Sequence, residues 1–149
     1  MAKSLENFDE KQLFDRYRIS FETMWLTFIL IFINCFIKIW FGPFAEPTVE
    51  MGILISFPLT YFAIRSIIKE AYFAKNVKNK TLSFASLAFL GIVMLISPVI
   101  YLAKGGSIIE NGLIVSPMAF LMSASTLFLI PIAYLIKKMT NKDIEEEKV

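Results

Sequence analysis

The stretch from Phe21 to Gly42 constrains this chain more than any other part of its sequence. It can cross a bilayer, because a spanning helix needs about 20 mainly apolar residues. Its second half nevertheless carries Asn34, Cys35 and Lys38. Polar groups are costly inside a hydrocarbon core, so this predicted membrane helix is also the first place in which to look for function.

Three further segments pass the same test of length and apolar composition. Hydrophobic residues make up 56% of the chain and its mean hydropathy is +0.63, whereas a typical soluble domain is about 45–50% apolar. Gly and Pro between residues 42 and 47, a basic stretch at 76–80, and a Gly-rich connection at 104–112 that we expect to be flexible separate the segments. The predicted spans are about 21–41, 48–73, 82–103 and 113–136, with a lead-in at 1–20 and a tail at 137–149.

The lead-in is charged, and its apolar residues recur at spacings of about three and four, which predicts an amphipathic helix. Short connections join span one to span two and span three to span four, so each pair should form an antiparallel hairpin. We therefore predict an all-α protein: one integral membrane domain with four transmembrane helices in an up-down-up-down bundle, preceded by an N-terminal amphipathic cytoplasmic lead-in helix.

The distribution of Lys and Arg predicts the orientation of the chain. Thirteen of these residues lie in or beside the lead-in, the middle connection and the tail, and only Lys38 and Lys104 lie at the opposite ends of the spans. Basic residues gather on the cytoplasmic side of membrane proteins, so both termini should be cytoplasmic. Twelve of the fifteen basic residues are Lys, and Ile and Phe are abundant, which we interpret as the imprint of an AT-rich bacterial genome. The expected location is the bacterial cytoplasmic membrane.

The residue inventory excludes several kinds of chemistry. The chain has no His and a single Cys, Cys35, so it lacks Ser–His and Cys–His nucleophile pairs, His-ligated zinc or haem, and an intrachain disulfide. We expect no enzyme activity, no cofactor and no metal site. The basic stretch from Arg65 to Lys80 is more typical of a cytoplasmic membrane anchor than of a nucleic-acid site, and we expect no nucleic-acid partner.

Four residues near the end of the first hairpin form a candidate polar seam. Asn34 and Lys38 are four residues apart and share a helix face. If the hairpin turns near residue 45, Lys38 lies level with Glu50, and Asn34 lies near Ser56. The seam is either an ion or substrate path, or a structural arrangement in which Lys38 reaches the interface beside Glu50 while Asn34 bonds across the helices.

Two further sets of charged residues are candidates at the cytoplasmic side. Glu22 should lie near Arg65 at the other end of the first hairpin, as an ion pair at the membrane boundary. The lead-in carries a candidate partner face formed by Asp9, Glu10 and Arg16. The lead-in is either a docking helix for a cytoplasmic protein or an extension of the first span that packs in the headgroup region.

The lead-in and first span also carry a resemblance. Asp9-Glu10, Gln12, Arg16 and Ile19 precede a span that contains Asn34 and the run Phe36-Ile37-Lys38. This layout resembles small bacterial four-span membrane proteins that are classed as domains of unknown function. The resemblance implies a membrane partner or antagonist of a regulator and implies no mechanism.

The sequence is compatible with two functions. The first is a small non-enzymatic integral membrane protein that acts through contacts with a membrane or cytoplasmic protein, or with a second copy of itself. The second is a small transporter or channel with a polar path near Asn34, Lys38 and Glu50. Both place the chain in contact with the lipid bilayer.

Overall fold

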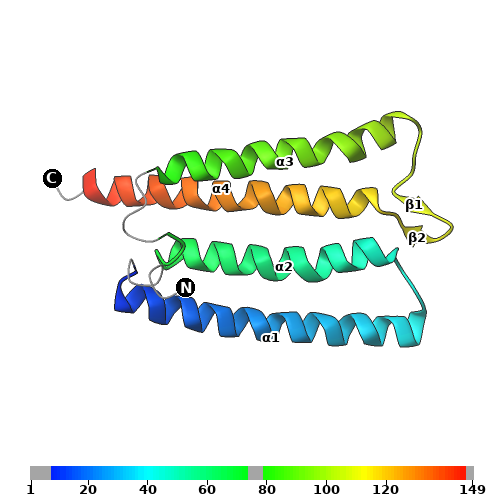
Figure 1. The fold of residues 1–149 in the computed structure, drawn as a ribbon, viewed down its shortest axis with the longest axis horizontal. Coiled ribbons are helices and arrows are strands. Elements are labelled where there is room, and N and C mark those ends of the chain that lie inside the picture. Colours follow the sequence, from blue (N-terminus) through cyan, green and yellow to red (C-terminus); the bar gives the residue numbers. More distant parts are fainter. Residues whose placement is uncertain (1–7, 74–78, 147–149) are drawn as a thin grey trace.

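The computed structural model describes residues 8–73 and 79–146 as four long helices and one short β-hairpin (Figure 1). In chain order the elements are α1 (Glu10–Phe41), α2 (Pro47–Ile68), α3 (Lys80–Ala103), β1 (Ile109–Glu110), β2 (Leu113–Ile114) and α4 (Pro117–Glu146). All four helices are long and apolar enough to cross a membrane, which confirms the prediction of an all-α, four-helix protein suited to a bilayer. Residues 1–7 of the lead-in, residues 74–78 of the middle connection and residues 147–149 of the tail lie outside the described residues.

α1 is one uninterrupted helix, so the described part of the lead-in is continuous with the first span. The helix starts at a capping box, in which the backbone N–H of Asp9 donates to Oε1 of Gln12 at 3.2 Å. It ends at Gly42, whose φ of 79° suits glycine and whose N–H donates to the carbonyl of Lys38. With 32 residues, α1 is ~48 Å long, so it extends beyond a hydrocarbon core ~30 Å thick.

The other boundaries differ in places from those predicted. α2 ends at Ile68 rather than near residue 73, because the chain turns at Glu70, which has a φ of 59°. α4 begins at Pro117 rather than near residue 113, because residues 113 and 114 form β2. Pro at the first turn of α2 and of α4 agrees with the tolerance of that position for a residue without an N–H.

The connection expected to be flexible is instead an ordered hairpin. Asn111 and Gly112 have φ values of 51° and 80°, as a two-residue turn of type I′ requires, and they join β1 to β2. Ile114 then bonds to the first connection: its N–H donates to the carbonyl of Phe44 and its carbonyl accepts from Glu46. The α1–α2 and α3–α4 connections are therefore joined at this end of the molecule.

The helices lie side by side in the order α1, α2, α4, α3 (Figure 1). Successive helices run in opposite directions along the long axis, so α1 begins and α4 ends at the same end of the molecule. We call this the terminal end and the opposite one the hairpin end. The main contacts join α1 to α2, α2 to α4, and α4 to α3. The predicted bundle is thus open, with α1 and α3 at its two edges.

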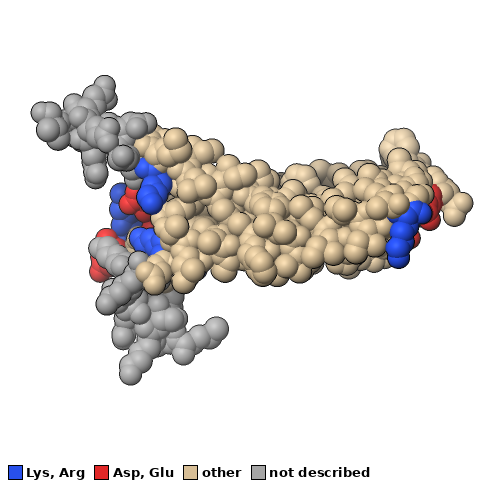
Figure 2. Space-filling view, turned by 90° about the horizontal axis from the view of Figure 1, so that it is seen from above, with Lys and Arg blue, Asp and Glu red and all other residues tan. Residues whose placement is uncertain are grey.

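Charged side chains gather at the two ends, as the space-filling view of one face shows (Figure 2). The surface between them is uncharged on this face. Large apolar side chains are exposed along all four helices, including Phe32, Ile55, Phe89 and Leu135. This pattern suits a molecule whose middle lies in hydrocarbon and whose ends lie in headgroups and water.

Two small clusters form the buried core. One, near the terminal end, contains Ala63, Ile67, Phe84 and Ile130, and Phe84 stacks on Tyr134 with ring centroids 4.2 Å apart. The other, near the hairpin end, contains Ala45, Val49 and Ala119. Small residues dominate the second cluster because α2 and α4 approach closely there: a Cβ added at Gly52 would lie 3.2 Å from the Cβ of Ala119.

Candidate functional site

An ion pair joins α1 to α2 near the hairpin end. Nζ of Lys38 lies 2.5 Å from Oε2 of Glu50. The Glu50 side chain is only 7% exposed, whereas that of Lys38 is 43% exposed. Each charge is also favourably placed on its own helix, since Lys38 lies in the last turn of α1 and Glu50 in the first turn of α2.

Asn34 lies one turn before Lys38 and faces a small cavity between α1 and α2. The cavity has a volume of about 80 Å³, and Glu50 lines it together with apolar side chains such as Ile37 and Leu54. Oδ1 of Asn34 is buried and accepts no hydrogen bond from any described residue. Two buried oxygen acceptors, one amide and one carboxylate, therefore share this cavity.

Ser56, the fourth residue of the predicted polar seam, lies elsewhere. It is buried between α2 and α4 and lines a separate pocket with Thr60 and Thr126. The structure thus brings Asn34, Lys38 and Glu50 together and places Ser56 apart from them. Position along the helix predicted that Ser56 lies near Asn34. The neighbour that a side chain contacts depends also on the direction in which it points around the helix axis.

A second charged cluster joins α1 to α2 nearer the terminal end. Oε2 of Glu22 accepts from the hydroxyl of Tyr61 at 2.8 Å and from Nη2 of Arg65 at 3.3 Å. Oε1 of Glu22 accepts from Nε of Arg18 at 3.1 Å, one turn earlier in α1. The structure thus brings together the Glu22–Arg65 pair considered from the sequence and adds Tyr61. The one available signal for Tyr61 was its position four residues before Arg65, on the same helix face.

The residues of the predicted partner face have different roles. Asp9 is the N-cap of α1, and Glu10 is exposed in the first turn. Arg16 instead points into the molecule, where its Nη1 donates to the carbonyls of Ala71 and Tyr72 at 3.2 and 3.3 Å. These three residues therefore do not form one exposed surface.

Lys137 completes a set of contacts around the end of α2 that sequence reasoning missed. Its Nζ donates to the carbonyls of Ile67 and Ile68 at 2.9 and 2.7 Å and lies 3.1 Å from Oε1 of Glu70. Together with Arg16 from α1, it places positive charge where the last carbonyls of a helix carry partial negative charge. Lys137 of α4 thereby holds the last turn of α2, and Arg16 of α1 holds the residues just after it.

A stripe of exposed aromatic side chains runs along α1. This α1 stripe consists of Phe14, Tyr17, Phe21, Trp25, Phe28 and Phe32, which are 47–68% exposed. Successive members are three or four residues apart, so all lie within about 80° of arc on an ideal helix. The side chains that contact α2 or the turn after it, such as Arg16 and Glu22, lie on other faces of the helix.

The arrangement offers charge pairing and hydrogen bonding rather than bond-making chemistry. Among the residues that the structure describes, no three His, Cys, Asp or Glu side chains are grouped so as to hold a metal ion. Cys35 is exposed on α1, between Asn34 and Lys38. Comparison with protein-family models, with curated proteins and with solved structures finds no match to this chain.

Proposed function

We propose that the protein is a non-enzymatic integral membrane protein that acts by binding a transmembrane helix of another protein along the α1 stripe. The observation that carries this proposal is the extent of the stripe. Phe14 and Tyr17 are 68% and 65% exposed, and they lie eight and five residues before Glu22. At ~1.5 Å per residue they are about 7–12 Å beyond Glu22 along α1, so contact with hydrocarbon does not account for them.

The position of α1 in the fold supports the same function. α1 is an edge helix whose main helix contacts are with α2 (Figure 1), and the stripe lies on another face of α1 than the side chains that bond to α2 or the turn after it. Its rings are held in a regular order, since Trp25 makes edge-to-face contacts with both Phe21 and Phe28 at centroid distances of 6.2 Å. A row of large rings is complementary to a helix face of Gly, Ala and Ser, because small residues let helices approach closely in a membrane.

Site-specific photocrosslinking in cells tests this function. A photoreactive amino acid in place of Tyr17 should yield a crosslinked protein, and the same residue in place of Phe89 on the α3 edge, which is 67% exposed, should not. Phe14→Ser with Phe21→Ser should abolish co-purification in mild detergent without loss of folded protein. A protein that purifies alone and crosslinks only to lipid would refute the proposal, and a crosslink to a second copy of the chain would change the partner to itself.

We further propose that both termini are cytoplasmic and that the membrane is the bacterial cytoplasmic membrane. The excess of Lys and Arg at one side of the spans supports this orientation. In a Cys35→Ser background, a cysteine at Ser107 should react with a membrane-impermeant maleimide added to intact cells. A cysteine at Glu10 should react only after lysis. The reverse pattern would overturn the orientation and leave the partner proposal intact.

A small transporter or channel is the second candidate, and the cavity beside Asn34 favours it. An unsatisfied amide oxygen and a buried carboxylate next to Lys38 could pass a small cation or a proton along the α1–α2 interface. In proteoliposomes that hold equal amounts of folded protein, Asn34→Leu and Lys38→Met should then change flux. Equal flux in these variants and in the parent protein would exclude this function.

A further inference from the structure

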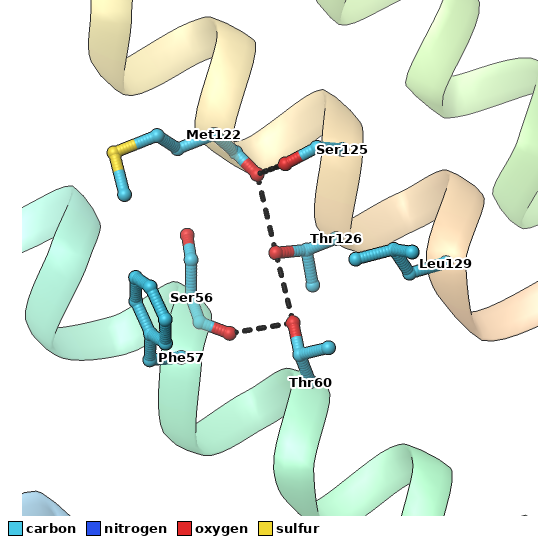
Figure 3. A pocket seen from close by; sticks show the side chains of 7 residues that line it. All are labelled: Ser56, Phe57, Thr60, Met122, Ser125, Thr126 and Leu129. Carbon is cyan, nitrogen blue, oxygen red and sulfur yellow. Dashed lines mark hydrogen bonds between the residues drawn. The ribbon is translucent and has the colours of Figure 1, made fainter.

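A pocket lies between α2 and α4, about halfway along α2 and about a third of the way along α4 (Figure 3). It has a volume of about 170 Å³. Its lining residues are Ser56, Phe57, Thr60, Met122, Ser125, Thr126 and Leu129. Phe57 and Leu129 are 56% and 45% exposed, so the pocket opens sideways to the surface that faces lipid. A cavity of ~150 Å³ can hold a benzene ring, so this pocket has room for one six-membered ring.

Three of the four hydroxyl groups in this pocket donate within the protein. Thr126 and Ser125 both donate to the carbonyl of Met122, at 3.1 and 2.7 Å. The Thr60 hydroxyl lies 2.7 Å from the carbonyl oxygen of Ser56 and 3.0 Å from the hydroxyl oxygen of Thr126, and it can donate its one proton to either. Hydroxyls that donate to the backbone retain lone pairs, so they can still accept a hydrogen bond from a ligand.

The Ser56 hydroxyl is the exception. Ser56 is only 7% exposed, and its Oγ points into the space between α2 and α4 (Figure 3). Its hydroxyl bonds to no residue in the described part of the chain. A hydroxyl without a partner is unfavourable in surroundings with little water. The pocket therefore combines one unused donor with several available acceptors.

We propose that this pocket binds a membrane-dissolved compound that carries a hydroxyl group on one six-membered apolar ring, such as a phenol. The ligand hydroxyl accepts from Ser56 and donates to the hydroxyl oxygen of Thr126 or Ser125, while the ring contacts Phe57, Met122 and Leu129. A lipid acyl chain carries no group that could bond to Ser56. The hydroxyl and ester groups of a lipid lie at the interface, whereas the pocket lies near the middle of the spans.

The experiment uses the full-length protein in lipid nanodiscs and two probes of the same shape, 4-fluorophenol and 4-fluorotoluene. Fluorine NMR follows saturable binding, and comparison between variants in the same lipid cancels the partitioning of each probe. The parent protein should bind 4-fluorophenol saturably. Ser56→Ala should weaken that binding about tenfold, the effect of one lost hydrogen bond, and should leave 4-fluorotoluene unchanged.

Two further variants separate this site from general effects. Ser123→Ala is the matched control, because the Ser123 hydroxyl donates to the carbonyl of Ala119 and does not line the pocket. It should bind both probes like the parent. Leu129→Trp should fill the pocket and abolish saturable binding. Equal binding of the two probes, or 4-fluorophenol binding that survives Ser56→Ala or Leu129→Trp, would overturn the proposal, as would the absence of saturable binding in the parent protein. Thermal unfolding shows that each variant is folded, and Ser56→Ala should be at least as stable as the parent.

Discussion

Removal of the Lys38 charge should destabilise the protein, because Glu50 would remain buried without its partner. The two charges lie 2.5 Å apart, for which Coulomb's law gives ~7 kcal/mol of attraction at an effective dielectric constant of ~20. The cost of burying the carboxylate offsets most of that attraction, and Lys38 is 43% exposed and still partly hydrated. Exposed pairs contribute up to ~1 kcal/mol and the loss of one partner of a buried pair costs ~3–5 kcal/mol, so we expect Lys38→Met to cost about 2 kcal/mol.

The assay is a double-mutant cycle on the free energy of unfolding. Unfolding in mixed micelles titrated with a denaturing detergent can be followed by the fluorescence of Trp25 and Trp40, which both lie in α1. Glu50→Leu in the Lys38→Met background removes the unpaired carboxylate, so the double variant should regain most of the lost stability. Lys104→Met is the matched control, since Lys104 is an exposed charge just after the end of α3.

The cycle can refute this reasoning in two ways. If Lys38→Met costs no more than Lys104→Met, the ion pair contributes nothing beyond an exposed charge. If the loss in free energy of unfolding of the double variant equals the sum of the losses of the two single variants, Lys38 and Glu50 are not coupled, although the structure places them in contact.

Two further predictions concern contacts of α4. Thr60→Val should lower the free energy of unfolding by about 0.6–1.5 kcal/mol, because it removes the hydrogen bond to Thr126 that joins α2 to α4. Ser125→Ala should change it by less than that, since the Ser125 hydroxyl bonds within its own helix. Gly91→Leu should cost about 1–3 kcal/mol, because a Cβ at this position already lies 3.2 Å from the ring of Phe128 and larger side chains would force α3 away from α4. Gly91→Ala should cost less, and thermal unfolding in one detergent ranks all four variants.

The elements of this fold were predictable because their signals are local. The lengths of the apolar segments predicted the four helices, and Gly42 and Pro47 predicted the sharp turn between α1 and α2. That turn fixed the relative level of the first two helices, and hence the proximity of Lys38 to Glu50. Asn111-Gly112 is a strong signal for a hairpin turn, whereas the expectation of a flexible connection rested on the glycine content of residues 104–112 alone.

The order in which the four helices lie side by side was not predictable in the same way. Lipid tails are as apolar as Leu, so hydrophobicity does not decide which membrane helices meet. Ser and Thr are equally ambiguous, because a hydroxyl can bond to its own helix on any face, as that of Ser123 does. Only the structure shows that Thr60 and Thr126 meet and that Ser56 faces α4 rather than Asn34. The contacts of Lys137 were not predictable for a related reason. Its main acceptors are backbone carbonyls, which every residue carries.

Among the described residues, the hydrogen bonds and ion pairs between helices converge on α2. α1 is bound to it by Lys38 at the hairpin end, by Glu22 nearer the terminal end, and by Arg16 just after its last turn. α4 is bound to it through Thr126 and Lys137, whereas no hydrogen bond or ion pair between described residues joins α1 to α3 or α4.

This asymmetry bears on the proposed function. A partner on the α1 stripe would meet a helix that is fixed along one face only, and any displacement of α1 would be resisted by the two charged clusters on α2. α2 also forms one wall of the Ser56 pocket. A change in the position of α1 can therefore reach the pocket through α2, and the polar contacts between α1 and α2 are where partner binding and pocket occupancy would be coupled if both occur.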